Sequence, residues 1–140
     1  MTLLVDTGAF YALADRSDRN SRAAKDFFLE ALDRYEFVTS SAVVLEAWTL
    51  IRNKLGWPAA GRYLDGLRKS EVAILFIEPV EFEAAARIMS DYADQQLSLT
   101  DAISFALMER HGIGDAFAFD KDFLLYRFGP RKQRSFTCWP

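Results

Sequence analysis

The sequence predicts an α/β fold in a single domain over residues 1–140, with a parallel sheet of four to five strands and helices on both faces. Three observations support this prediction. The length of 140 residues suits one domain. Short apolar runs of strand length alternate with longer segments that have helical periodicity. The apolar runs are not interrupted by alternating polar residues, which is typical of strands that are covered on both faces.

The first half of the chain predicts two strands and three helices. Leu3-Leu4-Val5 is the centre of a buried strand over residues 2–6. A helix is expected over 8–14, and another over 20–35, where apolar residues recur at steps of three and four. Phe37-Val38-Thr39 is a short strand candidate. A strongly apolar helix then covers 41–55 and ends at Gly56.

The second half continues the alternation. Pro58 is expected to open a helix that runs to about residue 70, because proline is favoured at the first helical position. A strand over 72–77 follows, and Pro79 opens a helix through Tyr92. The remaining expected elements are a helix over 99–111, a strand over 115–119 and an edge strand at Phe136-Thr137.

Composition narrows the class of protein. The net charge of -3 gives no global signature of a nucleic-acid binder, although a local basic rim is compatible with that total. The single Cys138 excludes an intrachain disulfide and a cysteine metal cluster. The start of the chain lacks a basic region before its apolar run, and no apolar stretch is long enough to span a membrane. We therefore expect a cytoplasmic protein that does not bind membranes.

Four carboxylates interrupt runs that are otherwise built for burial: Asp6, Glu46, Asp101 and Asp120. Asp6 and Asp120 follow predicted parallel strands, and ligands bind at that edge of an open α/β sheet. Glu46 lies in the first half of its helix and Asp101 in the first turn of its own, so all four could reach one site. Lys and Arg are scarce in these segments, which makes a divalent cation the expected counter-charge.

Such a site suits a particular chemistry. Mg²⁺ and Mn²⁺ are hard ions that prefer carboxylate and water oxygens. One or two of them can activate a water and stabilise the charge that develops during phosphodiester hydrolysis. This reaction needs no nucleophilic Ser, Cys or His. The sequence therefore predicts a metal-dependent phosphodiesterase.

Each acid also has an ordinary structural interpretation. Ser98 to Asp101 fits a helix capping box. Asp6 and Asp120 could be turn residues at strand ends, and Glu46 could pair with Arg52.

Basic and aromatic residues elsewhere in the chain are open to two interpretations. The basic residues near the C-terminus form either a solvated face or a contact for RNA phosphates; they are Arg127, Arg131, Lys132 and Arg134. Phe10, Tyr11 and Trp57 could stack on bases, although core packing is the usual role of aromatic residues.

Four stretches together resemble the PIN-domain ribonucleases, and specifically the VapC-type toxins of bacterial toxin–antitoxin pairs. These stretches are Leu4–Thr7, Thr39–Glu46, Leu97–Ala102 and Ala118–Phe123, in an order and spacing that cover essentially the whole chain. The resemblance implies a PIN-like domain with Mg²⁺-dependent (or Mn²⁺-dependent) endoribonuclease activity on RNA. It also implies a homodimer and a small antitoxin protein, a segment of which occupies the acidic cleft.

The resemblance also assigns roles to residues. It implies that Asp6, Glu46 and Asp101 bind the metal and that Asp120 assists directly or through water. Thr7 matches a small hydroxyl residue that orients the first carboxylate. Ser98, Thr100 and Asp122 are candidates for contacts around the ligands or with the substrate. Between Asp120 and Asp122 as the fourth acid, we favour Asp120 because it directly follows the predicted strand.

Two other classes of protein compete with a nuclease. A receiver-type signalling domain needs paired acids after the first strand and an acceptor Asp after the third, whereas Thr7-Gly8 follow Asp6 and the third strand ends Ile77-Glu78-Pro79. A catalytically inactive PIN-fold module that only binds a partner is the second alternative. The intact set of acids argues against that alternative.

Overall fold

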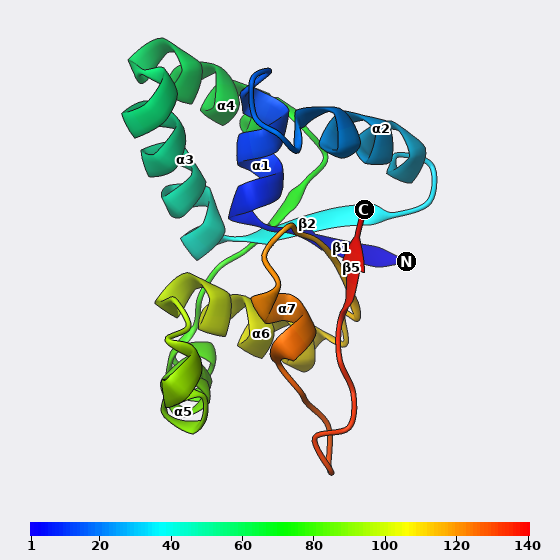
Figure 1. Ribbon diagram of the computed structural model, residues 1–140, viewed down its shortest axis with the longest axis vertical. Helices are drawn as coiled ribbons and strands as arrows, with labels where there is room; N and C mark the ends of the chain where they lie inside the picture. Colours follow the sequence, from blue (N-terminus) through cyan, green and yellow to red (C-terminus); the bar gives the residue numbers. More distant parts are fainter.

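The computed structural model describes residues 1–140 and has a five-stranded parallel sheet at its centre (Figure 1). The order of strands across the sheet is β3-β2-β1-β4-β5. Their bounds are Thr2–Val5 for β1, Glu36–Ser40 for β2, Ala73–Leu75 for β3, Asp115–Phe117 for β4 and Thr137–Trp139 for β5. The predicted α/β class is confirmed, with five strands.

The order of strands changes direction next to β1. From β1 the chain moves outward through β2 to β3, then returns to the other side of β1 to form β4 and β5. Leu4 is in register with Val38 of β2 on one side and with Ala116 of β4 on the other. Ligands bind outside the carboxyl ends of strands at such a switch point. The ends of β1 and β4 therefore define where a site is expected.

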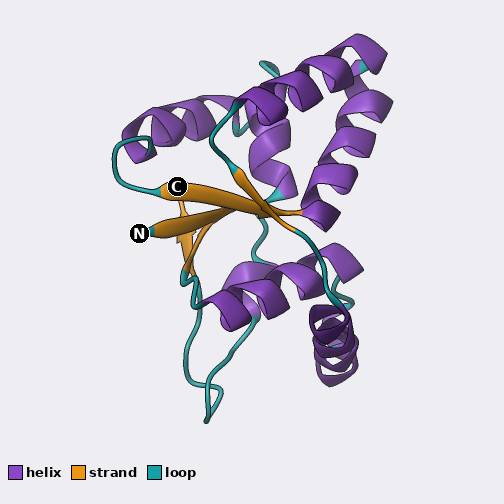
Figure 2. Cartoon of the chain, turned by 180° about the vertical axis from the view of Figure 1, so that it is seen from behind, coloured by secondary structure: helices purple, strands orange, loops and turns teal.

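Helices cover both faces of this sheet, as Figure 2 shows. The first face carries α1 (Thr7–Ala14) and α2 (Ser21–Ala31), which pack on Leu3, Val5 and Phe117. The second face carries α5, α6 and α7, which pack on Leu4, Ala116 and Ala118. The bounds of these three helices are Pro79–Asp91, Leu99–His111 and Asp122–Leu125. Neighbouring residues of one strand thus pack into two separate hydrophobic cores, one on each face of the sheet. This explains why the strands are apolar throughout.

Two further helices, α3 (Ser41–Leu55) and α4 (Trp57–Lys69), form a hairpin that projects beyond the sheet (Figure 1). Gly56 joins them with a φ of 98°, a conformation that favours glycine. Ser40 caps α3, because its side chain accepts a hydrogen bond from the Val43 amide at 3.0 Å. None of the helices is long and apolar enough to cross a membrane.

The structure differs from the predicted elements mainly at their ends. Helix α2 ends at Ala31 instead of residue 35, because the chain turns there so that Tyr35 can be buried. Strand β3 has three residues, since the Ile77 amide donates to the Ser41 side chain at 3.2 Å and not to the sheet. Strand β5 is Thr137–Trp139, one residue beyond the expected Phe136, which packs instead among core aromatics. Neither α7 nor a short 3₁₀ turn over Ala93–Gln95 was predicted.

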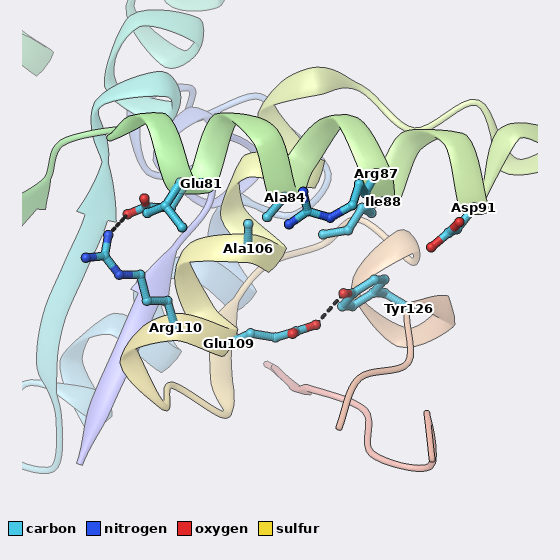
Figure 3. Close-up of a pocket in the computed structure, with 10 residues that line it drawn as sticks. Glu81, Ala84, Arg87, Ile88, Asp91, Ala106, Glu109, Arg110 and Tyr126 are labelled. Carbon is cyan, nitrogen blue, oxygen red and sulfur yellow. Dashed lines mark hydrogen bonds and ion pairs between the residues drawn. The ribbon is translucent and has the colours of Figure 1, made fainter. Parts of the chain in front are cut away.

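Helices α5 and α6 pack closely and share an ion pair (Figure 3). Glu81, in the first turn of α5, is only 1% exposed, and its Oε1 accepts a hydrogen bond from Arg110 Nη1 at 2.8 Å. Arg110 also contacts Glu78 at 2.8 Å. At the other end of the same interface, the Tyr126 hydroxyl donates to the carboxylate of Glu109. These polar contacts hold the last turn of α6, at Glu109 and Arg110, against α5 and Tyr126.

Candidate metal centre

The carboxyl ends of β1 and β4 bring the first and fourth predicted acids to the same place. The Asp6 amide donates to the carbonyl of Phe117, the last residue of β4, at 3.0 Å. Asp6 is only 3% exposed, and its Oδ1 has no hydrogen-bond partner. It precedes α1 without capping that helix through its side chain. Asp6 thus lies between β1 and α1, as the turn-residue interpretation expects, but a turn or a cap does not account for its buried, unpartnered Oδ1.

Asp101 enters the site from the first turn of α6. The capping-box interpretation is half right, because the Ser98 side chain accepts a hydrogen bond from the Asp101 amide at 3.0 Å. The Asp101 carboxylate does not reach back to Ser98; it faces Asp120 instead. Asp101 is 6% exposed. The cap thus fixes the helix end and leaves the acid free for another role.

Asp120 and Asp122 both lie beside Asp101. One carboxylate oxygen from each of these three residues can be found within 4.8 Å of the others. The premise that Asp120 directly follows a strand is wrong, because β4 ends at Phe117 and two residues intervene. Asp120 nevertheless raises the pKa of both Asp6 and Asp101, whereas Asp122 does not. Asp120 is therefore the more central of the two.

Glu46 lies on the second turn of α3, at the edge of the group. It forms no ion pair, and the Arg52 guanidinium lies over the Trp48 ring at 5.9 Å, so the Glu46–Arg52 pairing is absent. Its charge contributes to the raised pKa of Asp6 and, to the smallest extent among the causes, to that of Asp101. Glu46 thus faces the buried acids from the solvent side.

The electrostatics of the group favour a bound cation. Burial and the neighbouring Asp120 and Glu46 raise the pKa of Asp6 to about 7, although the amides of Thr7 and Gly8 partly offset this. Burial, together with Asp6 and Asp120, also raises the pKa of Asp101 well above its usual range. The three ion pairs of the protein all lie elsewhere, at Arg110 and Lys132. A divalent cation is the counter-charge that these oxygens fit.

Hydroxyl groups around the acids have different tasks. The Thr7 hydroxyl is buried and has no partner, which leaves it available beside Asp6. The Ser98 hydroxyl is used by the cap, so we assign it to the helix and not to the substrate. Thr100 is half-buried and lines a hollow together with Glu46.

Sequence reasoning missed two residues near the acids. The buried Thr39 hydroxyl donates to the carbonyl of Val5 at 2.8 Å and so holds the chain just before Asp6. A threonine near the end of a buried strand was the available signal. Cys138 lies close enough for Asp6 and Asp120, with burial as the main cause, to raise the pKa of its thiol to about 11. The thiol is therefore protonated and unreactive beside the acids.

Comparison with known families identifies this arrangement. The model of the PIN domain matches residues 3–129. The chain belongs to the PIN domain family. It is 31% identical over 121 residues to the 23S rRNA-specific endonuclease VapC20 of Mycobacterium tuberculosis, covering 86% of this chain and 91% of that protein. Ribonuclease VapC26 of the same species is 28% identical over 109 residues, which is 78% of this chain and 79% of VapC26.

Solved structures agree with this assignment. The crystal structure of M. tuberculosis VapC20, a Sarcin-Ricin loop cleaving toxin, superposes with a TM-score of 0.83 and 28% identity, covering 89% of this chain and 94% of that one. A toxin–antitoxin complex from Klebsiella pneumoniae gives a TM-score of 0.61 at 21% identity, over 86% and 88% of the two chains, and supports the fold alone. The PIN-domain protein described here is thus a VapC-type endoribonuclease toxin.

The receiver-type alternative fails on structural grounds. Receiver domains have the strand order 2-1-3-4-5, whereas this sheet has β3-β2-β1-β4-β5. Glu78, the acid after the third strand, pairs with Arg110 and does not join the cluster. Of the basic residues near the C-terminus, Arg134 lies beside Gly112 at the end of α6, which is about 17 Å of helix from Asp101 at about 1.5 Å per residue.

Proposed function

We propose that this toxin hydrolyses RNA phosphodiester bonds at the acidic cluster, with Mg²⁺ or Mn²⁺ held by Asp6, Asp101 and Asp120. The observation that carries the proposal is the meeting of acids from separate segments of the chain with no Lys or Arg paired to them. Glu46 completes the cluster from the solvent side. The unpartnered Asp6 Oδ1 supports the same assignment, because a buried charged oxygen needs a partner.

The acidic residues of the cluster would have different roles in the reaction. The bound cation would supply Lewis-acid stabilisation of the phosphate and an activated water. Asp6 and Asp101 would hold it in fixed positions, since Asp6 follows a strand and Asp101 lies in a capped helix turn. Asp120 is held by its own bond from the Asp122 amide at 2.9 Å and can orient the water. The single His111 is at the far end of α6, so no histidine base is needed.

Chelation tests this proposal directly. We expect cleavage of RNA by the purified protein to stop in excess EDTA and to return on addition of Mg²⁺ or Mn²⁺. The ratio of the two recovered rates identifies the preferred ion. Full cleavage in excess chelator would contradict the metal assignment.

The substrate that we propose is a structured loop of ribosomal RNA. The support is the similarity to VapC20, which extends over 86% of this chain. Incubation of the protein with intact ribosomes and with total RNA, followed by primer extension, measures where it cuts. A single cut in 23S rRNA is expected, and scattered cleavage of messenger RNA would contradict it.

We propose that the antitoxin docks in the large groove between α1, α2 and α4, in addition to the segment that the family resemblance places in the acidic cleft. This groove has a volume of about 1010 Å³ and is lined mainly by apolar side chains. Three basic side chains also line the groove, those of Arg16, Lys25 and Arg62. The one acidic side chain that lines it is Asp15, whose carboxylate already accepts hydrogen bonds from Tyr11 and Ser17. An acidic, amphipathic segment fits this chemistry. Charge reversal by Lys25→Glu with Arg62→Glu should weaken the toxin–antitoxin complex in calorimetry without slowing RNA cleavage.

We also propose a homodimer that buries the exposed apolar residues around α5. Leu45, Phe82 and Leu99 are 70%, 52% and 45% exposed and line one hollow. Apolar surface of this kind is typical of subunit interfaces. The variant Phe82→Arg should halve the mass measured by light scattering, and a wild-type protein that stays monomeric at high concentration would refute the dimer.

A further inference from the structure

The two helical pairs of the protein carry opposite charge. The α3–α4 hairpin, residues 41–69, has five basic and two acidic residues and a net charge of +3. Residues 79–111, which contain α5 and α6, have two basic and six acidic residues and a net charge of -4. The total of -3 conceals this difference. A polyanion that approaches the acidic cluster is therefore attracted on one side only.

The hairpin also exposes aromatic surface. Trp57, the first residue of α4, is 68% exposed, and its ring meets that of Trp48 edge to face with 5.6 Å between centroids. The guanidinium of Arg52 lies over the other ring of the pair, that of Trp48, at 5.9 Å. Arg52 is exposed and has no ion pair. By contrast, Tyr11 is buried, and Phe10 packs edge to face on Tyr63.

Helix α3 connects this surface to the cluster, because it carries Glu46 on one side and Trp48 on the other. Helix α3 buries Val43, Ala47 and Ile51. Glu46 and Trp48 are about 200° apart around the helix and so flank that buried face on opposite sides. The outward ridge between them is about one helix diameter wide, on the order of 10 Å, which a single strand spans within two nucleotides or so. A strand bound at Glu46 therefore reaches Trp48 and Trp57 by crossing the ridge at Arg52.

We propose that Trp57, supported by Trp48 and Arg52, is a stacking platform for an unpaired base of the RNA substrate a few nucleotides from the scissile phosphate. The inference rests on the proposed ribonuclease function of the acidic cluster. Sequence-specific RNA binding uses unstacked loop bases that lie on aromatic rings, and a neighbouring arginine contributes phosphate attraction. The antitoxin groove lies on another face of α4, and Trp57 does not line it. Neither Trp48 nor Trp57 lines the hollow assigned to the second copy.

The decisive comparison is between Trp57→Leu and Trp57→Phe in the full chain. Trp57→Leu removes the stacking of one base, so it should raise KM for an RNA hairpin with an unpaired loop about tenfold at unchanged kcat. Trp57→Phe keeps an aromatic face and should stay within about threefold of wild type. The exposure of Trp57 makes loss of folding by either change unexpected, and circular dichroism checks it.

Arginine variants give a second, independent measurement. Arg52→Ala should reduce the dependence of log KM on log salt by about 0.7, the value for one phosphate contact to a single strand. Arg87→Ala is the matched control, because Arg87 is equally exposed and unpaired but lies on the acidic α5. It should leave the salt dependence unchanged.

The outcomes separate this proposal from the one on which it depends. A wild-type protein without metal-dependent cleavage refutes the ribonuclease function. Active wild type with an unchanged KM in Trp57→Leu, or with equal KM values in Trp57→Leu and Trp57→Phe, overturns the platform alone. If Trp57→Leu weakens antitoxin binding and leaves KM unchanged, the surface serves a protein partner and the platform is likewise overturned.

Discussion

Asp6 and Glu81 are equally hidden from solvent but have opposite surroundings. Asp6 is 3% exposed and Glu81 is 1% exposed, and each has one carboxylate oxygen without a hydrogen-bond partner. Glu81 faces Arg110 at 2.8 Å, whereas Asp6 faces Asp120 and Glu46. A buried acid that is neutralised within the protein serves the packing of helices. A buried acid among like charges costs stability and is retained for what it binds.

The largest expected difference between the two acids is in catalysis. Asp6→Asn removes a proposed metal ligand, and the expected loss of several kcal/mol of metal-derived stabilisation should lower kcat by about a thousandfold or more. Glu81→Gln should leave the kcat of the folded fraction within about threefold of wild type, since Glu81 lies in the α5–α6 interface and not at the cluster. Single-turnover cleavage assays compare them. Equal losses in both variants would mean that the Asp6 effect is structural.

The second difference concerns pH. Without metal, the pKa of Asp6 is raised from 3.8 to about 7 in the folded state. Between these two pH values the folded protein holds a proton that the unfolded chain has lost. The contribution of Asp6 to stability is therefore fully present below pH 4 and is lost as the pH rises toward 7. A difference of this size in pKa corresponds to a loss of roughly 4 kcal/mol in the free energy of unfolding. Urea unfolding in EDTA between pH 4 and 8 measures it.

Controls for the pH prediction follow from the same comparison. Asp6→Asn cannot ionise and should flatten much of the profile, leaving the part due to Asp101, whose pKa is raised for the same reasons. Saturating Mn²⁺ should flatten the profile of the wild type at neutral pH, because the cation replaces the proton. A wild-type profile that rises with pH in EDTA would contradict the assignment of unpaired buried acids.

The third difference concerns Arg110, the partner of Glu81. Arg110→Met leaves Glu81 buried without its cation, which costs about 3–5 kcal/mol for a fully buried pair. The Arg110 side chain is 45% exposed, so solvent screening reduces the expected loss of stability below that of a fully buried pair. Chemical denaturation measures this loss, and the metal affinity of the folded protein should not change. A parallel loss of metal affinity would show that the two regions are coupled.

Much of the site was predictable because strand ends and helix starts are encoded locally. An acid directly after an apolar run identified Asp6, and the pattern from Ser98 to Asp101 predicted both the cap and the position of the acid. The β1–β4 pairing could not be derived from the residues, since contacts between distant segments leave no local pattern. For the same reason, the bond from Thr39 to Val5 was missed. The short α7, which places Asp122, is a single turn without periodicity.

The smallest expected effect tests how the two helix-borne acids are presented. Ser98 caps α6 and Ser40 caps α3, each by a bond of 3.0 Å to the amide three residues on. Ser98→Ala should cost about 1 kcal/mol of stability. Because Asp101 is in the first turn of α6, fraying there should also weaken metal binding by up to about tenfold. Glu46 lies a further turn into α3, so Ser40→Ala should affect stability more than metal affinity. Calorimetric titration with Mn²⁺ measures the metal affinity of both variants. A larger loss of affinity in Ser40→Ala than in Ser98→Ala would place Glu46, rather than Asp101, closer to the ion.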